Sequence, residues 1–179
     1  LVDENDRIIG SALRSDCHGD PRCMHRSVHL FVLNQEREIY LQKRSPGKRV
    51  QPGKWDTSVG GHIAAGEQTV EALFREANEE LGLKSFSPTF MYRYIMRNSF
   101  ESELINTFVC IWHQSIRPNP DEISSGRFWR EEEIVAALGG CALTPNFEDE
   151  FQRFTDWRRR YPRRYTALFS NESVPYEGG

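Results

Sequence analysis

Long hydrophobic runs, abundant cysteine and a strong charge of either sign are all missing from this sequence. No apolar stretch approaches the ~20 residues of a membrane span, and the N-terminal residues lack the apolar core of a signal peptide. The 23 basic and 26 acidic side chains give a formal net charge of −3, so there is no overall attraction to nucleic acid or anionic lipid. The four cysteines are irregularly spaced, which favours a reducing compartment. We therefore expect a cytoplasmic protein without a membrane or nucleic-acid partner.

Short stretches of strand and helix character alternate along the chain. Apolar runs predict strands at 28–33, 38–42, 55–59, 90–96, 104–112 and 128–129, and helical spacing predicts helices at 69–81, at 131–138 and after 145. A turn between apolar pieces suggests a small hairpin at 2–13, and a polar loop is predicted at 17–26. The alternation, without repeats or a long linker, predicts one α/β domain over residues 1–179, with 145–179 as a C-terminal helical extension.

The segment Thr69–Leu81 has the clearest helical pattern in the sequence. At 100° per residue, its apolar side chains fall within an arc of roughly 100°, the width of a stripe that faces a core. These side chains are Val70, Leu73, Phe74, Ala77 and Leu81. Gly82 then supplies the left-handed conformation that commonly ends a helix. We predict a helix over 69–81 with one face on the core.

Three glutamates gather on one side of this predicted helix. Glu76, Glu79 and Glu80 stand at positions i, i+3 and i+4, so their carboxylates are neighbours. Like charges this close repel each other unless a cation compensates them, and Mg²⁺ prefers oxygen ligands. Glu67, just before the helix, is near enough in sequence to join them. A divalent cation bound there polarises a phosphoryl oxygen and neutralises a leaving diphosphate.

Arg75 and Gly61 complete the pattern around the glutamates. Arg75 points away from the metal side of the helix and can orient a glutamate through a bidentate pair. Gly61 allows the strand-to-helix loop to turn and brings its backbone close to phosphate. The plainer alternative is an amphipathic helix with a solvated acidic face. The pattern fixes seven positions. If each residue type has a usage of about 7%, the probability that all seven match by chance at one starting position is on the order of 10⁻⁸, which argues against that alternative.

The spacing of these residues resembles the signature of the Nudix hydrolases, G-x5-E-x7-R-E-U-x-E-E-x-G-U with U aliphatic. It runs from Gly61 to Leu83, and the one soft departure is the small Ala77 at an aliphatic position. The resemblance implies an α/β/α sandwich with a mixed sheet and hydrolysis of a nucleoside diphosphate derivative or related diphosphate. It also implies Mg²⁺ or Mn²⁺ bound by Glu76, Glu79 and Glu80, with Glu67 as a further ligand. The surrounding strand order extends the likeness over roughly 2–138.

A second likeness is to one branch of that superfamily, the type I isopentenyl-diphosphate isomerases. Histidines and acids that match the positions where those enzymes hold a metal are His18, His25, His62, Glu101 and Glu103. The segment 56–62 also resembles the isomerase strand that carries a catalytic cysteine, but Gly60 stands at that position. This departure and the intact hydrolase signature both favour hydrolysis. The likeness leaves open a second metal site; for each lone histidine, the alternative is a loop or capping residue.

Three further features of the sequence allow two readings each. Arg44 ends a predicted strand and is our candidate for binding substrate phosphate, although a solvated basic loop fits the neighbouring Lys48 and Arg49 equally well. Glu122, in a loop outside the signature, is a candidate catalytic base beside Glu79 and Glu80, or simply a solvated acid. The arginine-rich segment 158–164 suggests RNA, but cations at a helix end explain it as well.

We conclude from the sequence that this is a metal-dependent hydrolase of a small-molecule diphosphate. The assigned catalytic residues are Arg75, Glu79, Glu80 and Glu122, and the substrate-binding residues are Arg44 and Gly61. An isomerase-like enzyme acting on isopentenyl diphosphate and a non-catalytic sensor of a diphosphate ligand are the alternatives. A zinc cluster built on Cys17-His18 and Cys23-x-His25 is disfavoured, because that cysteine spacing is not a common zinc motif. The resembled family also allows a homodimer.

Overall fold

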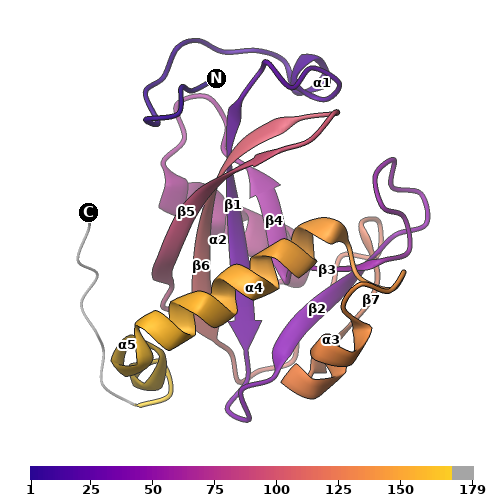
Figure 1. Cartoon of the computed structure of the whole chain (residues 1–179), viewed down its shortest axis with the longest axis vertical. Helices are drawn as coiled ribbons and strands as arrows, with labels where there is room; N and C mark the ends of the chain where they lie inside the picture. The colour runs from indigo at the N-terminus through magenta and orange to yellow at the C-terminus, as the bar shows by residue number, and fades with distance from the viewer. Residues whose placement is uncertain (171–179) are drawn as a thin grey trace.

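A computed structural model describes residues 1–170, and within this range the chain forms a mixed seven-stranded sheet between helices (Figure 1). The strands are β1 (His25–Leu33), β2 (Ile39–Arg44), β3 (Trp55–Asp56), β4 (Val59–His62), β5 (Thr89–Arg97), β6 (Ser102–Ile111) and β7 (Ile123–Trp129). The helices are α1 (Arg14–Cys17), α2 (Thr69–Leu81), α3 (Glu131–Ala137), α4 (Pro145–Arg160) and α5 (Pro162–Ala167). Among these, none is long and apolar enough to cross a membrane.

The central strand β1 organises the sheet. It pairs in parallel with β6 and antiparallel with β2 and β4, while β3 and β7 pair with β2, and β5 pairs with β6. Helix α4 crosses one face of the sheet and α2 lies on the other, as Figure 1 shows. The predicted α/β/α sandwich with a mixed sheet is confirmed.

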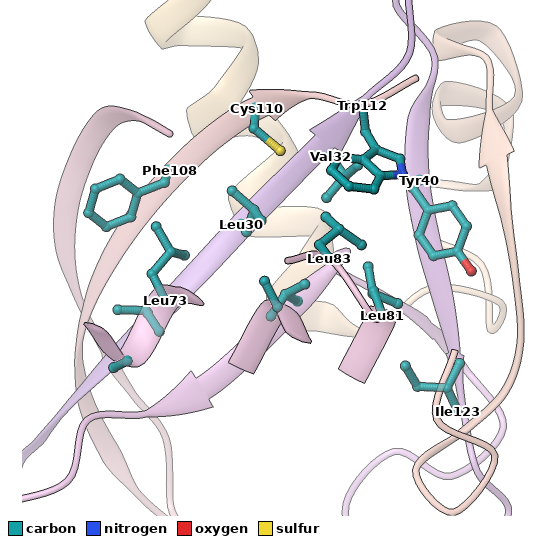
Figure 2. Packing of buried hydrophobic residues seen from close by; sticks show 14 residues of the cluster. Leu30, Val32, Tyr40, Leu73, Leu81, Leu83, Phe108, Cys110, Trp112 and Ile123 are labelled. Atoms are coloured by element: carbon teal, nitrogen blue, oxygen red, sulfur yellow. The ribbon is translucent and has the colours of Figure 1, made fainter. Parts of the chain in front are cut away.

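The two faces of β1 bury two different cores, which is why this strand is apolar along most of its length. Val28, Leu30 and Val32 point toward α2, and Figure 2 shows Leu30 and Val32 gathered with Leu73 and Leu81 of that helix. Phe31 and Leu33 point the other way, into a core made largely with α4 and α5. Side chains therefore alternate between an α2 face and an α4 face along the strand.

The clearest sequence signals gave the correct boundaries for α2. This helix runs from Thr69 to Leu81 as predicted, with a capping box between Gln68 and Glu71. Gly82 takes a left-handed conformation with φ 71° and ends the helix. At the start of α4, the Thr144 hydroxyl accepts a hydrogen bond from the Phe147 amide at 3.1 Å, and Pro145 stands in the first turn, so Thr144 caps the helix predicted after 145.

Other boundaries differ from the predictions for identifiable reasons. The strand predicted at 55–59 is two strands, because β3 pairs with β2 whereas β4 pairs with β1. The predicted polar loop at 17–26 is shorter, since Cys17 ends α1 and β1 already starts at His25. The predicted hairpin at 2–13 reduces to one bridge between Val2 and Ile8. Residues 171–179 of the predicted C-terminal extension lie outside the described part of the chain.

Candidate functional site

The glutamates of α2 differ in burial according to their position around the helix. Leu73, Ala77 and Leu81 anchor α2 on the core. Glu80, on the flank of this apolar stripe, is only 7% exposed. The side chain of Glu76 is 14% exposed, and that of Glu79 is 55% exposed. Two carboxylates therefore face strand β4, and the third faces solvent.

Strand β4 passes these carboxylates without a side chain in the way. A β-carbon added at Gly61 would lie 2.0 Å from the carboxyl carbon of Glu76, so only glycine permits this approach. Glu80 accepts a hydrogen bond from the Gln42 side chain at 2.9 Å and from the backbone N–H of Gly60 at 3.3 Å. Burial, with a smaller contribution from the charges of Glu76 and Glu122, outweighs the hydrogen bonds from Gly60 and Gln42 and raises the pKa of the Glu80 carboxyl to about 8.

Arg75 binds several members of the acidic group at once. Its Nε and one terminal nitrogen form a bidentate pair with Glu67 at 2.8 and 2.9 Å. The other terminal nitrogen donates to Glu76 at 2.8 Å and reaches Glu79 at 3.4 Å. The first terminal nitrogen also donates to the backbone oxygen of His62 at 3.0 Å. We call Glu67, Glu76, Glu79 and Glu80 the carboxylate cluster; Arg75 fixes three of its members relative to strand β4.

Glu122 and Arg44, both predicted from the sequence, lie in different surroundings. Glu122 precedes β7 and is held by the ammonium group of Lys48 at 2.8 Å. It is close enough to the carboxylate cluster to raise the pKa of Glu80. Arg44 instead pairs with Asp56 at 3.1 Å and donates to the Val50 carbonyl at 3.0 Å. Among residues 1–170, no ion pair joins Arg44 to the carboxylate cluster.

The second predicted set, here called the His/Glu cluster, comes together at one end of the sheet. Its members are His18, His25, His62, Glu101 and Glu103. One ligand atom from each of His25, His62 and Glu103 lies within 4.8 Å of the others. His18 reaches Glu101 at 3.0 Å through Nδ1. Since side chains alternate along a strand, His62 projects to the α4 face whereas its neighbour Gly61 faces Glu76 on the α2 face.

The donor atoms of the His/Glu cluster fit a divalent cation. Burial raises the pKa of Glu103, but hydrogen bonds from His25 and His62 outweigh it and hold this pKa well below its usual range. Burial and the neighbouring His62 lower the pKa of His18, whereas the interaction of His25 with Glu103 outweighs burial and raises the pKa of His25. Nε2 of His25 and Oε2 of Glu101 are buried without a hydrogen-bond partner. Neutral imidazole nitrogens and carboxylate oxygens with free lone pairs are the donors that a transition metal takes. This group contains no cysteine, so nothing favours the Cys17 and Cys23 zinc alternative.

Two residues that the sequence interpretation did not link are joined in the core. His29 of β1 forms an ion pair with Glu150 of α4 at 2.8 Å. Glu150 is fully buried. A signal existed, because Glu150 interrupts the apolar stripe of Phe147, Phe151 and Phe154 with a charge. Nothing in the sequence pairs it with a residue so far away in the chain.

Comparison with known proteins agrees with this geometry. The family described as NUDIX domain matches residues 24–159, which includes most of α4 and so reaches beyond the predicted limit of 138. An isopentenyl-diphosphate Delta-isomerase 1 of Photorhabdus laumondii subsp. laumondii is 34% identical over 84% of this chain and 90% of its own length. A Nudix hydrolase of Deinococcus radiodurans is 31% identical over 77% of this chain and 81% of its own length.

A solved structure of a protein from Deinococcus radiodurans superposes with a TM-score of 0.72 and 28% identity, covering 86% of this chain and 96% of that one. The chain belongs to the Nudix family, in the branch that resembles isopentenyl-diphosphate isomerases. Within that family it is a Nudix hydrolase, an enzyme of the class that cleaves diphosphate linkages.

Proposed function

We propose that this enzyme hydrolyses the diphosphate linkage of a small organic molecule at the carboxylate cluster, with Mg²⁺ or Mn²⁺ as its cofactor. The observation that carries the proposal is the approach of Glu76 and Glu80 to the side-chain-free pair Gly60–Gly61. Oxygen atoms from Glu67, Glu76, Glu79 and Glu80 form the hard ligand set that Mg²⁺ prefers. A cation bound there neutralises charge on the phosphoryl oxygens.

The protein groups have separate tasks in this proposal. Glu76 and Glu80 hold the cation, because they are the two carboxylates that face the glycine pair of strand β4. Arg75 positions Glu67 and Glu76 through its hydrogen bonds. The exposed carboxylates of Glu79 and Glu122 are left to accept the proton of the attacking water. Separate Glu79→Gln and Glu122→Gln variants distinguish these two bases, since loss of the acting base lowers kcat even at saturating Mn²⁺.

The two proposed substrate-binding residues, Gly61 and Arg44, differ in their position relative to the carboxylate cluster. The backbone of Gly61 lies beside Glu76, so a phosphate bound to the cation also lies close to this peptide. Arg44 is paired with Asp56, and within the described residues it makes no ion pair with the carboxylate cluster. We propose that Arg44 acts on the part of the substrate nearer the His/Glu cluster, because burial and Glu103 raise the pKa of Glu101 and the charge of Arg44 is near enough to oppose that rise.

The test is product release across a panel of substrates. Phosphate and diphosphate release is measured with Mg²⁺ or Mn²⁺ on a nucleoside diphosphate sugar, a dinucleoside polyphosphate, an oxidised nucleoside triphosphate and an isoprenoid diphosphate. Glu80→Gln removes one ligand, and Glu71→Gln on the same helix is the matched control because glutamine also caps a helix. Turnover that collapses only in Glu80→Gln supports the proposal. Tight diphosphate binding without turnover of any substrate supports a sensor and overturns it.

The His/Glu cluster supports a second candidate function, an isomerase-like reaction on isopentenyl diphosphate. All five residues of the resembled metal site come together on the α4 face. Gly60, which carries no acid or base, argues against this reaction. Incubation with isopentenyl diphosphate in deuterated water tests it: deuterium incorporation that depends on Glu103 establishes the isomerase chemistry, and its absence excludes this activity.

A further inference from the structure

A buried glutamine of strand β2 contacts the carboxylate cluster. Gln42 is only 7% exposed, and its Nε2 donates to Oε2 of Glu80 at 2.9 Å. The same nitrogen donates to the backbone oxygen of Ser58 at 3.4 Å. Both neighbours are acceptors, and a carboxamide donates only from its nitrogen, so this end of the amide has to face them. Gln42 therefore presents a donor to Glu80 in one defined orientation.

The backbone around Gln42 holds this donor in place. At Gln42, strand β2 pairs with β3 on one edge and with β7 on the other. The Ser58 hydroxyl donates to the backbone oxygen of Tyr40 and accepts from the backbone N–H of Val32 at 2.9 Å. Ser58 thus joins β1 to β2, and its carbonyl lies on a fixed part of the sheet. The amide of Gln42 is held between this carbonyl and Glu80.

The two oxygens of Glu80 have different surroundings. Oε2 accepts from Gln42 of β2 at 2.9 Å and from the backbone N–H of Gly60 of β4 at 3.3 Å. Within residues 1–170, Oε1 accepts no hydrogen bond, and it is not among the fully buried unpaired atoms. Glu76 is divided in the same way, with its Oε1 bound to Arg75 at 2.8 Å. Oε1 of Glu80 is therefore the oxygen that is left for solvent or a cation.

A held oxygen matters because the last torsion of a glutamate is soft. The terminal bond of this side chain has broad, roughly two-fold preferences, so an unsupported carboxylate rotates. Partners that hydrogen-bond the ligands of a metal orient those ligands, and their loss typically costs about 10-fold to 100-fold in metal affinity or activity. Donors from two different strands restrain the carboxylate of Glu80 in this way.

We propose that Gln42 is a positioning residue, which holds Oε2 of Glu80 and so directs Oε1 toward the divalent cation of the carboxylate cluster. Gln42 acts through Glu80 and touches neither the cation nor the substrate. The inference rests on the proposed function in one respect, the binding of a cation at this cluster. The alternative is that Gln42 only satisfies the carbonyl of Ser58 and stabilises the sheet.

A methionine variant and a double-mutant cycle separate the two roles. Gln42→Met keeps the length of the side chain and removes the donor. Thr107→Val is the matched control, because Thr107 is also buried on a strand and donates to a buried carboxylate, that of Glu150, at 3.2 Å. The cycle combines Gln42→Met with Glu80→Gln, since residues that act through each other give non-additive effects. The probe is Mn²⁺ alone, titrated by calorimetry, and the binding that is lost in Glu80→Gln identifies the carboxylate cluster.

We expect Gln42→Met to bind Mn²⁺ at this cluster about 10-fold to 100-fold more weakly than the parent. Thr107→Val should bind Mn²⁺ as the parent does. When Glu80 is already glutamine, Gln42→Met should change the remaining Mn²⁺ affinity little. A folded Gln42→Met variant with parental Mn²⁺ affinity overturns the inference, and so does an equal loss of affinity in both backgrounds.

A measurement on the parent decides the question if Gln42→Met does not fold. The side-chain amide ¹⁵N resonance of Gln42 is followed while Mg²⁺, which is diamagnetic, is added. The hydrogen bond to Glu80 should couple this resonance to the cation, so it should shift with the same midpoint as Mg²⁺ binding. A resonance that stays in place through saturation overturns the inference.

The results also separate this inference from the hydrolase proposal. Turnover that is lost in Glu80→Gln, together with parental kcat and Mn²⁺ affinity in Gln42→Met, leaves the hydrolase and removes the role of Gln42. Coupling between Gln42 and Glu80 in Mn²⁺ binding, in a protein that hydrolyses none of the substrates, leaves the positioned cation site and removes the hydrolase.

Discussion

The close contact between Gly61 and Glu76 makes Gly61→Ala the most discriminating perturbation of the carboxylate cluster. The added β-carbon would lie 2.0 Å from the carboxyl carbon of Glu76 and 2.3 Å from its Oε1. Non-bonded carbon atoms settle at about 3.5–4.0 Å, so the carboxylate has to retreat by about 1.5 Å. That movement breaks the 2.8 Å hydrogen bond from Arg75 to Glu76. A misplacement of about 1 Å in a catalytic arrangement costs on the order of 100-fold in rate.

We therefore expect Gly61→Ala to lower kcat by about 100-fold and to weaken Mn²⁺ binding. The free energy of unfolding should change by only about 1–3 kcal/mol, because the displaced group is the end of a flexible side chain. Steady-state kinetics, Mn²⁺ titration and urea unfolding measure these three effects. Gly47→Ala is the control, since its β-carbon meets only the Ser45 hydroxyl at 3.9 Å. A Gly61→Ala enzyme with parental kcat and parental Mn²⁺ affinity refutes the assigned role of Glu76.

Three further predictions concern Arg75, the His29 ion pair and the core. Arg75→Lys loses the bidentate pair with Glu67 and should lower kcat about 10-fold or more, while urea unfolding changes by under about 1 kcal/mol. The pKa of His29 is raised from 6.5 to about 9, so its pairing with Glu150 stabilises the fold fully below pH 6.5 and loses that effect as the pH rises through 9. The unfolding free energy should fall by up to about 3 kcal/mol between pH 7 and pH 10, and a flat profile contradicts the ion pair. Phe154→Ala, at a side chain only 1% exposed, should cost about 3–5 kcal/mol in the same urea assay, and a loss below 1 kcal/mol contradicts its place in the core.

Local physics explains which parts of this fold were predictable from the sequence. The boundaries of α2 follow from its apolar stripe, its cap and Gly82, all of which lie within a few residues of one another. The split between β3 and β4 was not predictable, because it depends on each strand finding a different partner across the sheet. No pattern within 55–59 encodes that choice.

The same distinction holds for the functional residues. Helical geometry alone brings Glu76 and Glu80 to one side of α2, and the spacing of Arg75 is part of the same signature. The His/Glu cluster was predicted from a family resemblance and not from sequence spacing. Its members lie in the segment before β1, in β1, in β4 and around the start of β6, so no single local pattern contains them. The pair of His29 and Glu150 joins strand β1 of the sheet to helix α4, far apart in the sequence, and lies beyond the reach of local patterns.

The hydrogen bond from Arg75 to the backbone oxygen of His62 gives the two clusters a shared mechanical element. Arg75 is bound to Glu67 and Glu76 on the α2 face, while the imidazole of His62 lies 3.3 Å from Glu103 on the α4 face. A ligand that shifts the peptide of His62 thus alters the free energy of the carboxylate geometry, and thermodynamic reciprocity requires the converse. If cations bind at both proposed sites, their titration should require an interaction parameter between the two sites. A fit by two independent isotherms contradicts this connection.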